Sequence, residues 1–328
     1  MTNFPLLNVL LEEKASSKVF ELKDLIIDSI TSISERLADD KYFPHKKYDT
    51  TKAKEEIENS DGYVKTGGFS ETHAELRFDD QLRKMLESQI RFAISKWIHS
   101  DTIFAKPEYI SIDNNEKHYH GAVGTHHYDD DQKVPQSKIP VKKFMVSGKF
   151  VTILFHQIVD ELRSRPKPTK TTKEEVYIMR MNESILAAIN DPTVNKELNI
   201  FCSIVVHEAQ HLAQHKKGMH DRYFPNTQKN ALGNKNNSFG EPINKLNYYA
   251  EYGEIDAYAV DLASKLLLDN VPKGAKANIR DLMLKANHAF YTDFDKNQLP
   301  NTNIEPIRQR FIKRVFNALN HYNDTLED

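Results

Sequence analysis

The sequence has few of the features that mark a secreted or a nucleic-acid-binding protein. Its 328 residues include a single cysteine, Cys202, so no disulfide can form within the chain. This is typical of proteins from a reducing compartment. The 45 basic and 47 acidic side chains give a formal net charge of -2. Because this balance supplies no overall field that attracts nucleic acid or an anionic membrane, we expect neither as a partner.

Long hydrophobic segments are also missing. The longest strongly apolar run, residues 200–206, is much shorter than the roughly 20 residues that a membrane-spanning helix needs. Near the N-terminus, residues 4–11 are apolar, but no basic residue precedes them, and Glu12 and Glu13 follow. This pattern is not that of a signal peptide. We predict a cytoplasmic protein, located in a host cytoplasm if a virus encodes it.

Most of the sequence has helical periodicity, with apolar residues at three- and four-residue intervals. It predicts helices at residues 20–38, 78–99, 150–162, 198–215, 248–268, 275–292 and 304–322. Strand-like composition at 108–113 and 118–128, around the turn signal Asn114-Asn115, predicts a hairpin, and 176–181 predict a further strand. The fold class is therefore α+β and mostly helical. The charged segment 129–143 is the best candidate boundary, which separates an N-terminal region of unknown role, 1–145, from residues 146–328.

One short motif carries recognisable chemistry. Residues 207–211, His-Glu-Ala-Gln-His, fit the pattern H-E-x-x-H within the helix predicted at 198–215. Residues four apart lie on one face of a helix, so His207 and His211 can point at one metal ion. Glu208 can reach a water molecule beside that ion, where zinc lowers the pKa of water towards neutrality. The motif predicts one zinc ion, with Glu208 as the general base.

An H-E-x-x-H motif can also arise by chance on a solvent-exposed helix. Here apolar residues 204–206 precede the motif, and Leu212 and Ala213 continue it. A largely buried helix that carries two histidines and a carboxylate needs partners for them. A metal ion is such a partner, so the context favours a metal site.

A catalytic zinc usually has three protein ligands, and the motif supplies two. His215 lies another helical turn along and is poorly placed for a compact tetrahedral site, whereas His220 could approach after a chain reversal at Gly218. The metzincin pattern requires glycine at 214 and histidine at 217. The sequence has Gln214 and Lys217 instead, so that pattern is excluded.

Downstream, residues 254–259, Glu-Ile-Asp-Ala-Tyr-Ala, lie in the helix predicted at 248–268. Together with the first motif, they resemble the gluzincin zinc peptidases, most of all the ImmA/IrrE-like and phage-encoded cytosolic members. The resemblance covers roughly residues 176–268 and implies that Glu254 is the third zinc ligand and that Ala257 lets the two helices approach closely. Three further positions match the family's two histidine ligands and its catalytic glutamate: His207, His211 and Glu208.

The resemblance also implies a zincin-like core, with a small sheet, an H-E-x-x-H helix and a second helix that bears the glutamate ligand, within residues 146–328. The connection at 221–247 makes the spacing between the motifs longer than in compact members. Glu251 is the main rival of Glu254, and Asp256 is a candidate acceptor for a histidine N–H.

An oxyanion donor is still needed for amide hydrolysis, and aromatic or histidine side chains often supply one. We select Tyr258, one turn after Glu254, as this catalytic residue. The other nearby candidates are Tyr223, Tyr248, Tyr249, Tyr252 and His220. The histidines at 118, 120, 126 and 127 fit an exposed loop better than a second metal site. Cys202 is predicted to be a small core residue.

These residues predict zinc-dependent hydrolysis of a peptide bond in a protein or peptide substrate. The strand predicted at 176–181 would bind an extended substrate by adding it to the sheet. A second hypothesis is a non-catalytic zinc-containing protein with a binding or regulatory role, in which the 221–247 connection covers the cleft. A third is a metal-dependent hydrolase of a non-peptide bond. Glu208 favours catalysis, because a purely structural site needs no base.

Overall fold

The fold is mostly helical, with one small sheet. The computed structural model describes residues 16–33, 71–98, 110–113, 121–124, 143–164, 173–216, 252–293 and 304–326. The helices are η1 (Ser16–Lys18), α2 (Val19–Thr31), α5 (Glu71–Ile98), α6 (Lys149–Ser164), α7 (Lys173–Asn190), α8 (Pro192–Lys216), α12 (Tyr252–Asn270), α13 (Ile279–Asp293) and α14 (Ile304–Asp324). The predicted α+β, mostly helical class is confirmed.

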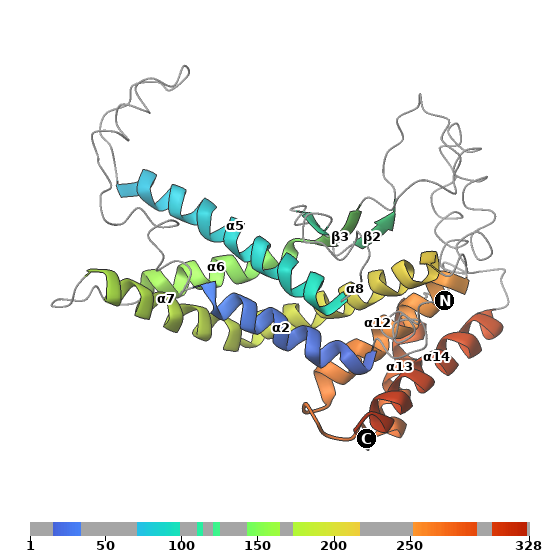
Figure 1. The fold of residues 1–328 in the computed structure, drawn as a ribbon. Helices are drawn as coiled ribbons and strands as arrows, with labels where there is room; N and C mark the ends of the chain where they lie inside the picture. Colours follow the sequence, from blue (N-terminus) through green and yellow to red (C-terminus); the bar gives the residue numbers. More distant parts are fainter. Residues whose placement is uncertain are drawn as a thin grey trace, which may run out of the picture.

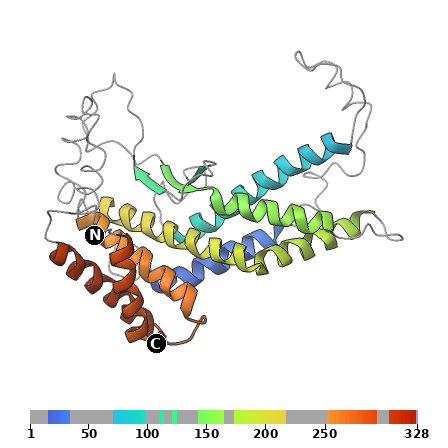
Figure 2. The same cartoon turned by 180° about the vertical axis from the view of Figure 1, so that it is seen from behind.

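Helix α8 joins two groups of helices (Figures 1 and 2). On one side it contacts α2, α6 and α7, and α5 packs against α2 and α6. On the other side it packs against α12, which in turn contacts α13 and α14. The motif helix therefore runs through the middle of the molecule, where it is largely buried.

The sheet lies against α8 and has the strand order β1-β3-β2. Strand β3 (Lys143–Ser147) pairs in parallel with β1 (Ile110–Asp113) and antiparallel with β2 (Gly121–Gly124). Phe144 and Val146 are buried and alternate with the half-buried Met145, as the two-residue period of a strand requires. Both β2 and β3 contact α8, so the sheet covers part of the motif helix (Figure 1).

Two strand predictions are wrong. Residues 176–181 belong to helix α7, because the buried residues Met181, Ile185 and Ala188 continue the apolar pattern at helical spacing. The long helical period outweighs the strand preference of a short apolar run. The predicted hairpin also fails, since β1 and β2 do not pair with each other. Strand β3 lies between them. The sequence pattern does not predict a strand at β3, because its apolar segment is short.

The start of α8 is fixed by a local capping arrangement. Asp191 Oδ1 accepts hydrogen bonds from the backbone N–H groups of Thr193 and Val194 at 2.8 and 3.1 Å. Pro192 occupies the first helical position, where its missing N–H is not needed. The helix therefore begins at Pro192, before the predicted residue 198, and the cap helps to set the position of the motif further along.

A polar network connects three helices beneath the motif. Lys23 Nζ on α2 donates to Asn195 Oδ1 and Asn199 Oδ1 on α8, at 2.7 and 2.8 Å. Asn199 Nδ2 in turn donates to Asp269 Oδ1 on α12 at 2.8 Å. Because this network joins α8 to α12, it supports the relative placement of the two helices that carry the site.

Apolar side chains from both sides of residue 145 meet in one core. Ile26 of α2 and Phe144 of β3 are fully buried, as are Phe150 of α6 and Phe201 of α8, whose ring centroids lie 5.2 Å apart. The proposed roles of residues 1–145 and 146–328 stay predictions. None of the helices that the structure describes has the length and apolarity needed to cross a membrane.

Candidate metal centre

The site is formed where α8 and α12 pack together. Ala257 on α12 is fully buried, and its backbone has a hydrogen bond with His207 on α8. Side chains this small let helix backbones approach closely. Functional groups on the facing sides of the two helices can therefore come within contact distance, as expected for Ala257.

The three predicted metal ligands converge at this contact. His207, His211 and Glu254 each offer one ligand atom, and these atoms lie within 4.8 Å of one another. The two histidine Nε2 atoms are 3.1 Å apart. Glu254 Oε1 is 3.4 Å from His211 Nε2, and Glu254 Oε2 is 3.7 Å from His207 Nε2. The three side chains are only 3–12% exposed, so little water can reach them.

The position of Glu254 follows from its place on α12. It lies in the first turn of the helix, where a carboxylate is favoured by the helix dipole, and it is only 2% exposed. Its Oε2 atom has no hydrogen-bond partner. A buried carboxylate oxygen without a partner is costly, and a cation held against it would remove that cost.

His207 is held against α12. Burial lowers the pKa of its imidazole well below the usual value, and the neighbouring His211 lowers it further, while a backbone hydrogen bond with Ala257 acts in the opposite direction. The ring of Tyr258 packs edge-on against it, with centroids 4.7 Å apart. His207 is therefore neutral at neutral pH, which is the state that a metal ligand requires.

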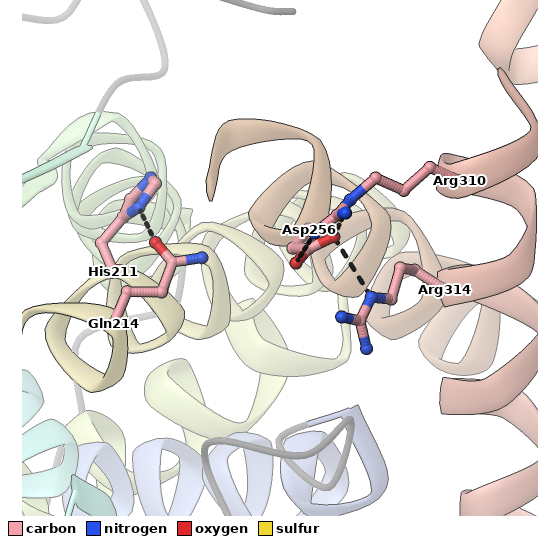
Figure 3. A network of polar contacts seen from close by, with 5 residues as sticks. All are labelled: His211, Gln214, Asp256, Arg310 and Arg314. Carbon is pink, nitrogen blue, oxygen red and sulfur yellow. Dashed lines mark hydrogen bonds and ion pairs between the residues drawn. The ribbon is translucent and has the colours of Figure 1, made fainter. Parts of the chain in front are cut away.

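His211 has a different electrostatic environment. Burial, the largest influence, lowers the pKa of its imidazole, but the hydrogen bond and charge of Glu254 oppose burial, with help from Glu208 and Gln214. The result is a pKa of about 9 in the metal-free protein. His211 Nδ1 also lies 3.0 Å from Gln214 Oε1 (Figure 3). Without a metal ion, the positive charge of protonated His211 thus neutralises Glu254. A bound metal ion would take over this role.

Glu208 is a second buried carboxylate beside the ligands. It is 4% exposed, and its Oε2 atom has no hydrogen-bond partner. Burial raises its pKa to about 8, against the influence of His211, while the charges of Glu254 and Asp261 raise it further. A buried acid with a perturbed pKa beside a candidate metal site is typical of a catalytic group.

The donor set fits a zinc ion. Two imidazole nitrogens and one carboxylate oxygen are ligands that catalytic zinc sites use, with a remaining position for water or substrate. Without a cation, the two Nε2 atoms 3.1 Å apart cannot both present lone pairs to each other favourably. A cation between them and Glu254 would satisfy all three ligands. Within the described ranges, this is the group of such residues close enough to hold a metal.

Asp256 does not act as the predicted acceptor for a histidine N–H. Its carboxylate instead receives hydrogen bonds from Arg310 and Arg314 on α14 (Figure 3). Successive helical residues are rotated by about 100°, so a residue two positions after Glu254 faces the opposite side of α12. The prediction failed because it used closeness in sequence without this rotation.

Several sequence candidates cannot be compared with the site. Glu251, Tyr223, Tyr248, Tyr249 and His220 lie outside the described residues, as do the four histidines between 118 and 127 and the 221–247 connection. His215 lies in α8, and Tyr252 is the first residue of α12. Cys202 is fully buried, and burial raises its pKa to about 12, so its predicted place in the core is confirmed.

Gln214 is a polar neighbour of the ligands that the sequence motifs do not identify. In the sequence it only marks a departure from the metzincin pattern, which has glycine at this position. Its spacing of three residues after His211 was the available signal, since such pairs lie on one helical face.

No family model, no curated protein and no solved structure matches this chain in the comparisons with known proteins. We therefore infer the function from the geometry of the site.

Proposed function

We propose that this protein is a zinc metallopeptidase with a zincin-like core, similar to the gluzincins. The observation that carries the proposal is the convergence of His207, His211 and Glu254 at the α8–α12 contact, with the unpartnered carboxylate of Glu208 beside it. The ligand residues come from two helices distant in sequence, so the arrangement is a property of the fold and not of the short motif alone.

His207, His211 and Glu254 would hold the ion, and the small side chain of Ala257 lets the two helices lie close enough for this. When bound, zinc lowers the pKa of water and polarises a carbonyl oxygen. Glu208 has the position and the environment of the general base. It would accept a proton from the attacking water and deliver it to the leaving amine, and its burial keeps its proton affinity high enough for both transfers.

Strand β2 replaces residues 176–181 as the candidate substrate-binding strand. It lies at an edge of the described three-stranded sheet and contacts the motif helix. An extended peptide can add to such an edge through backbone hydrogen bonds. Because these bonds do not involve side chains, the edge can bind peptides of many sequences. This placement favours a protein or peptide substrate.

Tyr258 remains our candidate for stabilising the oxyanion. Its ring lies against His207, which brings it to the edge of the ligand cluster. A phenol at this position can donate a hydrogen bond to negative charge that develops on a carbonyl oxygen. Replacement by phenylalanine would keep the ring contact and remove only the donor.

A non-catalytic zinc protein is the competing function. Structural zinc sites are usually closed by four protein ligands, whereas the described residues supply three. Such a site also has no use for Glu208, whose buried carboxylate is costly to keep. Both observations favour hydrolysis.

Metal content and proteolysis measured on the same preparations test the proposal. Wild type, Glu208→Gln and Glu254→Gln would be compared for bound zinc and for cleavage of an unfolded casein substrate, with Glu183→Gln, an exposed site on α7, as the matched control. We expect wild type and the control to hold one zinc and cleave, Glu208→Gln to hold zinc without cleaving, and Glu254→Gln to lose zinc.

Three results would count against the proposal. If wild type cannot be loaded with zinc, the proposed metal centre is wrong. Cleavage by Glu208→Gln at the wild-type rate would show that another group is the base, and zinc binding without cleavage of any unfolded substrate would favour the non-catalytic function.

A further inference from the structure

We infer that Gln214 is a positioning residue of the metal centre: its side-chain carbonyl holds the His211 ring so that Nε2 faces the ion. The inference rests on the proposed zinc site and extends it by one residue. Gln214 is not one of the three ligands and would act through His211.

The contact is local and buried. Gln214 follows His211 by three residues on α8, is 4% exposed, and places Oε1 3.0 Å from His211 Nδ1 (Figure 3). On the other side of the ring, His211 Nε2 faces His207 Nε2 and Glu254 Oε1. The ring therefore lies between Gln214 and the ligand cluster.

The chemistry of the contact selects one form of the imidazole. Metal ligation requires a neutral histidine, in which one ring nitrogen carries a hydrogen and the other a lone pair. A carbonyl oxygen can only accept a hydrogen bond, so Gln214 Oε1 favours the form with the hydrogen on Nδ1. The lone pair is then on Nε2, the atom that faces Glu254.

The two histidines are oriented by different elements. His207 has a backbone hydrogen bond with Ala257 and a ring contact with Tyr258, both on α12. His211 has its contact with Gln214 on α8, the helix to which it belongs. A substitution at Gln214 should therefore disturb His211 while the packing of His207 on α12 remains.

Gln210 offers a matched control. It lies one turn before Gln214 on the same helix and is 8% exposed, and its Oε1 atom has no hydrogen-bond partner. Gln210→Leu and Gln214→Leu make the same chemical change at similar depth. Only the second removes an acceptor from a ligand histidine.

The test is the zinc affinity of the full chain, measured by competition with a fluorescent chelator. We expect Gln214→Leu to bind zinc about 10- to 100-fold more weakly than wild type, as is usual when a residue that orients a ligand is lost. Gln214→Glu keeps an acceptor at the same reach and should recover most of this loss. Gln210→Leu should bind like wild type. Circular dichroism would show that each variant is folded.

A second measurement uses the wild-type protein and does not depend on a variant that folds. In the zinc-loaded protein labelled with 15N-histidine, we expect the His211 hydrogen on Nδ1 and slow exchange of that hydrogen with water. A hydrogen on Nε2, or equal zinc affinity of Gln214→Leu and wild type, would overturn the role of Gln214 alone. If wild type binds no zinc, the proposed function fails together with this inference.

Discussion

Arg310 on α14 donates two hydrogen bonds to Asp256 on α12, from Nε to Oδ1 at 3.0 Å and from Nη2 to Oδ2 at 2.8 Å. Arg314 Nε donates to the same Oδ1 at 3.2 Å. Asp256 follows Glu254 by two residues, about 200° around the helix, so the contact holds α12 from the face opposite the ligand. The C-terminal helix thus supports the helix that supplies the third ligand.

The first prediction concerns this contact. Asp256→Asn removes the charge that both arginines share, and it should lower the free energy of unfolding by about 2 kcal/mol, the usual size for hydrogen bonds to charged groups. Urea denaturation measures the change. The same substitution at Asp160, an exposed residue of α6, should have almost no effect. Equal stability of wild type and Asp256→Asn would show that α14 does not hold α12 through this carboxylate.

The second prediction concerns the pH dependence of the metal-free protein. The pKa of Glu208 rises from 4.5 to about 8, chiefly through burial. The folded state therefore binds this proton more tightly than the unfolded chain, and stability falls as the pH rises from about 4.5 through about 8. Glu208→Gln has no carboxyl group at this position, so its stability does not fall in this way. It should exceed wild type in stability by on the order of a few kcal/mol near pH 8.

Thermal unfolding in the presence of a chelator would measure this difference at several pH values. A constant difference between Glu208→Gln and wild type from pH 5 to pH 8 would contradict the assignment, because the buried carboxylate would then not be the group that titrates.

The third prediction is that zinc stabilises the fold. A ligand that binds only the folded state adds about 2.7 kcal/mol at a concentration 100-fold above its dissociation constant. Removal of zinc by a chelator should therefore lower the melting temperature of wild type by on the order of 5 °C. Glu254→Gln, which lacks one ligand, should melt at the same temperature with and without the chelator. A chelator effect of equal size in both proteins would place the stabilising metal elsewhere.

The fourth prediction concerns the contact between α8 and α12. Ala257→Leu inserts a larger side chain at a fully buried position and should cost about 1–3 kcal/mol of stability. It should also weaken zinc binding, because the helices must separate and Glu254 moves with α12. Ala187→Leu, at a half-buried position of α7, is the control and should keep full zinc affinity. Wild-type zinc affinity of a folded Ala257→Leu variant would show that close packing here is not required.

The sequence predicted the parts of the site that depend on local periodicity. His207, Glu208 and His211 lie on one helix as expected, because the apolar pattern around them is long and regular. Glu254 comes close to the histidines although the 221–247 connection separates the two motifs, because α12 packs against α8. The roles of these residues in catalysis and metal binding stay predictions.

Features that depend on distant contacts were not predictable in the same way. The strand order depends on which strands pair with β3, and no local pattern in the sequence indicates these partners. Residues 176–181 predict a strand because this window is too short to show the helical period of α7. The contact of Asp256 with Arg310 depends on how α14 packs on α12, which the sequence does not indicate locally.

The most direct test of the metal centre is zinc-edge X-ray absorption on the purified, zinc-loaded protein, together with its zinc content. We predict one zinc per chain with nitrogen and oxygen ligands at about 2.0–2.2 Å, an imidazole signal from two histidines and no sulfur. In Glu254→Gln this signal should weaken or disappear. Zinc bound through sulfur, or an unchanged spectrum and zinc content in Glu254→Gln, would contradict a centre built from His207, His211 and Glu254.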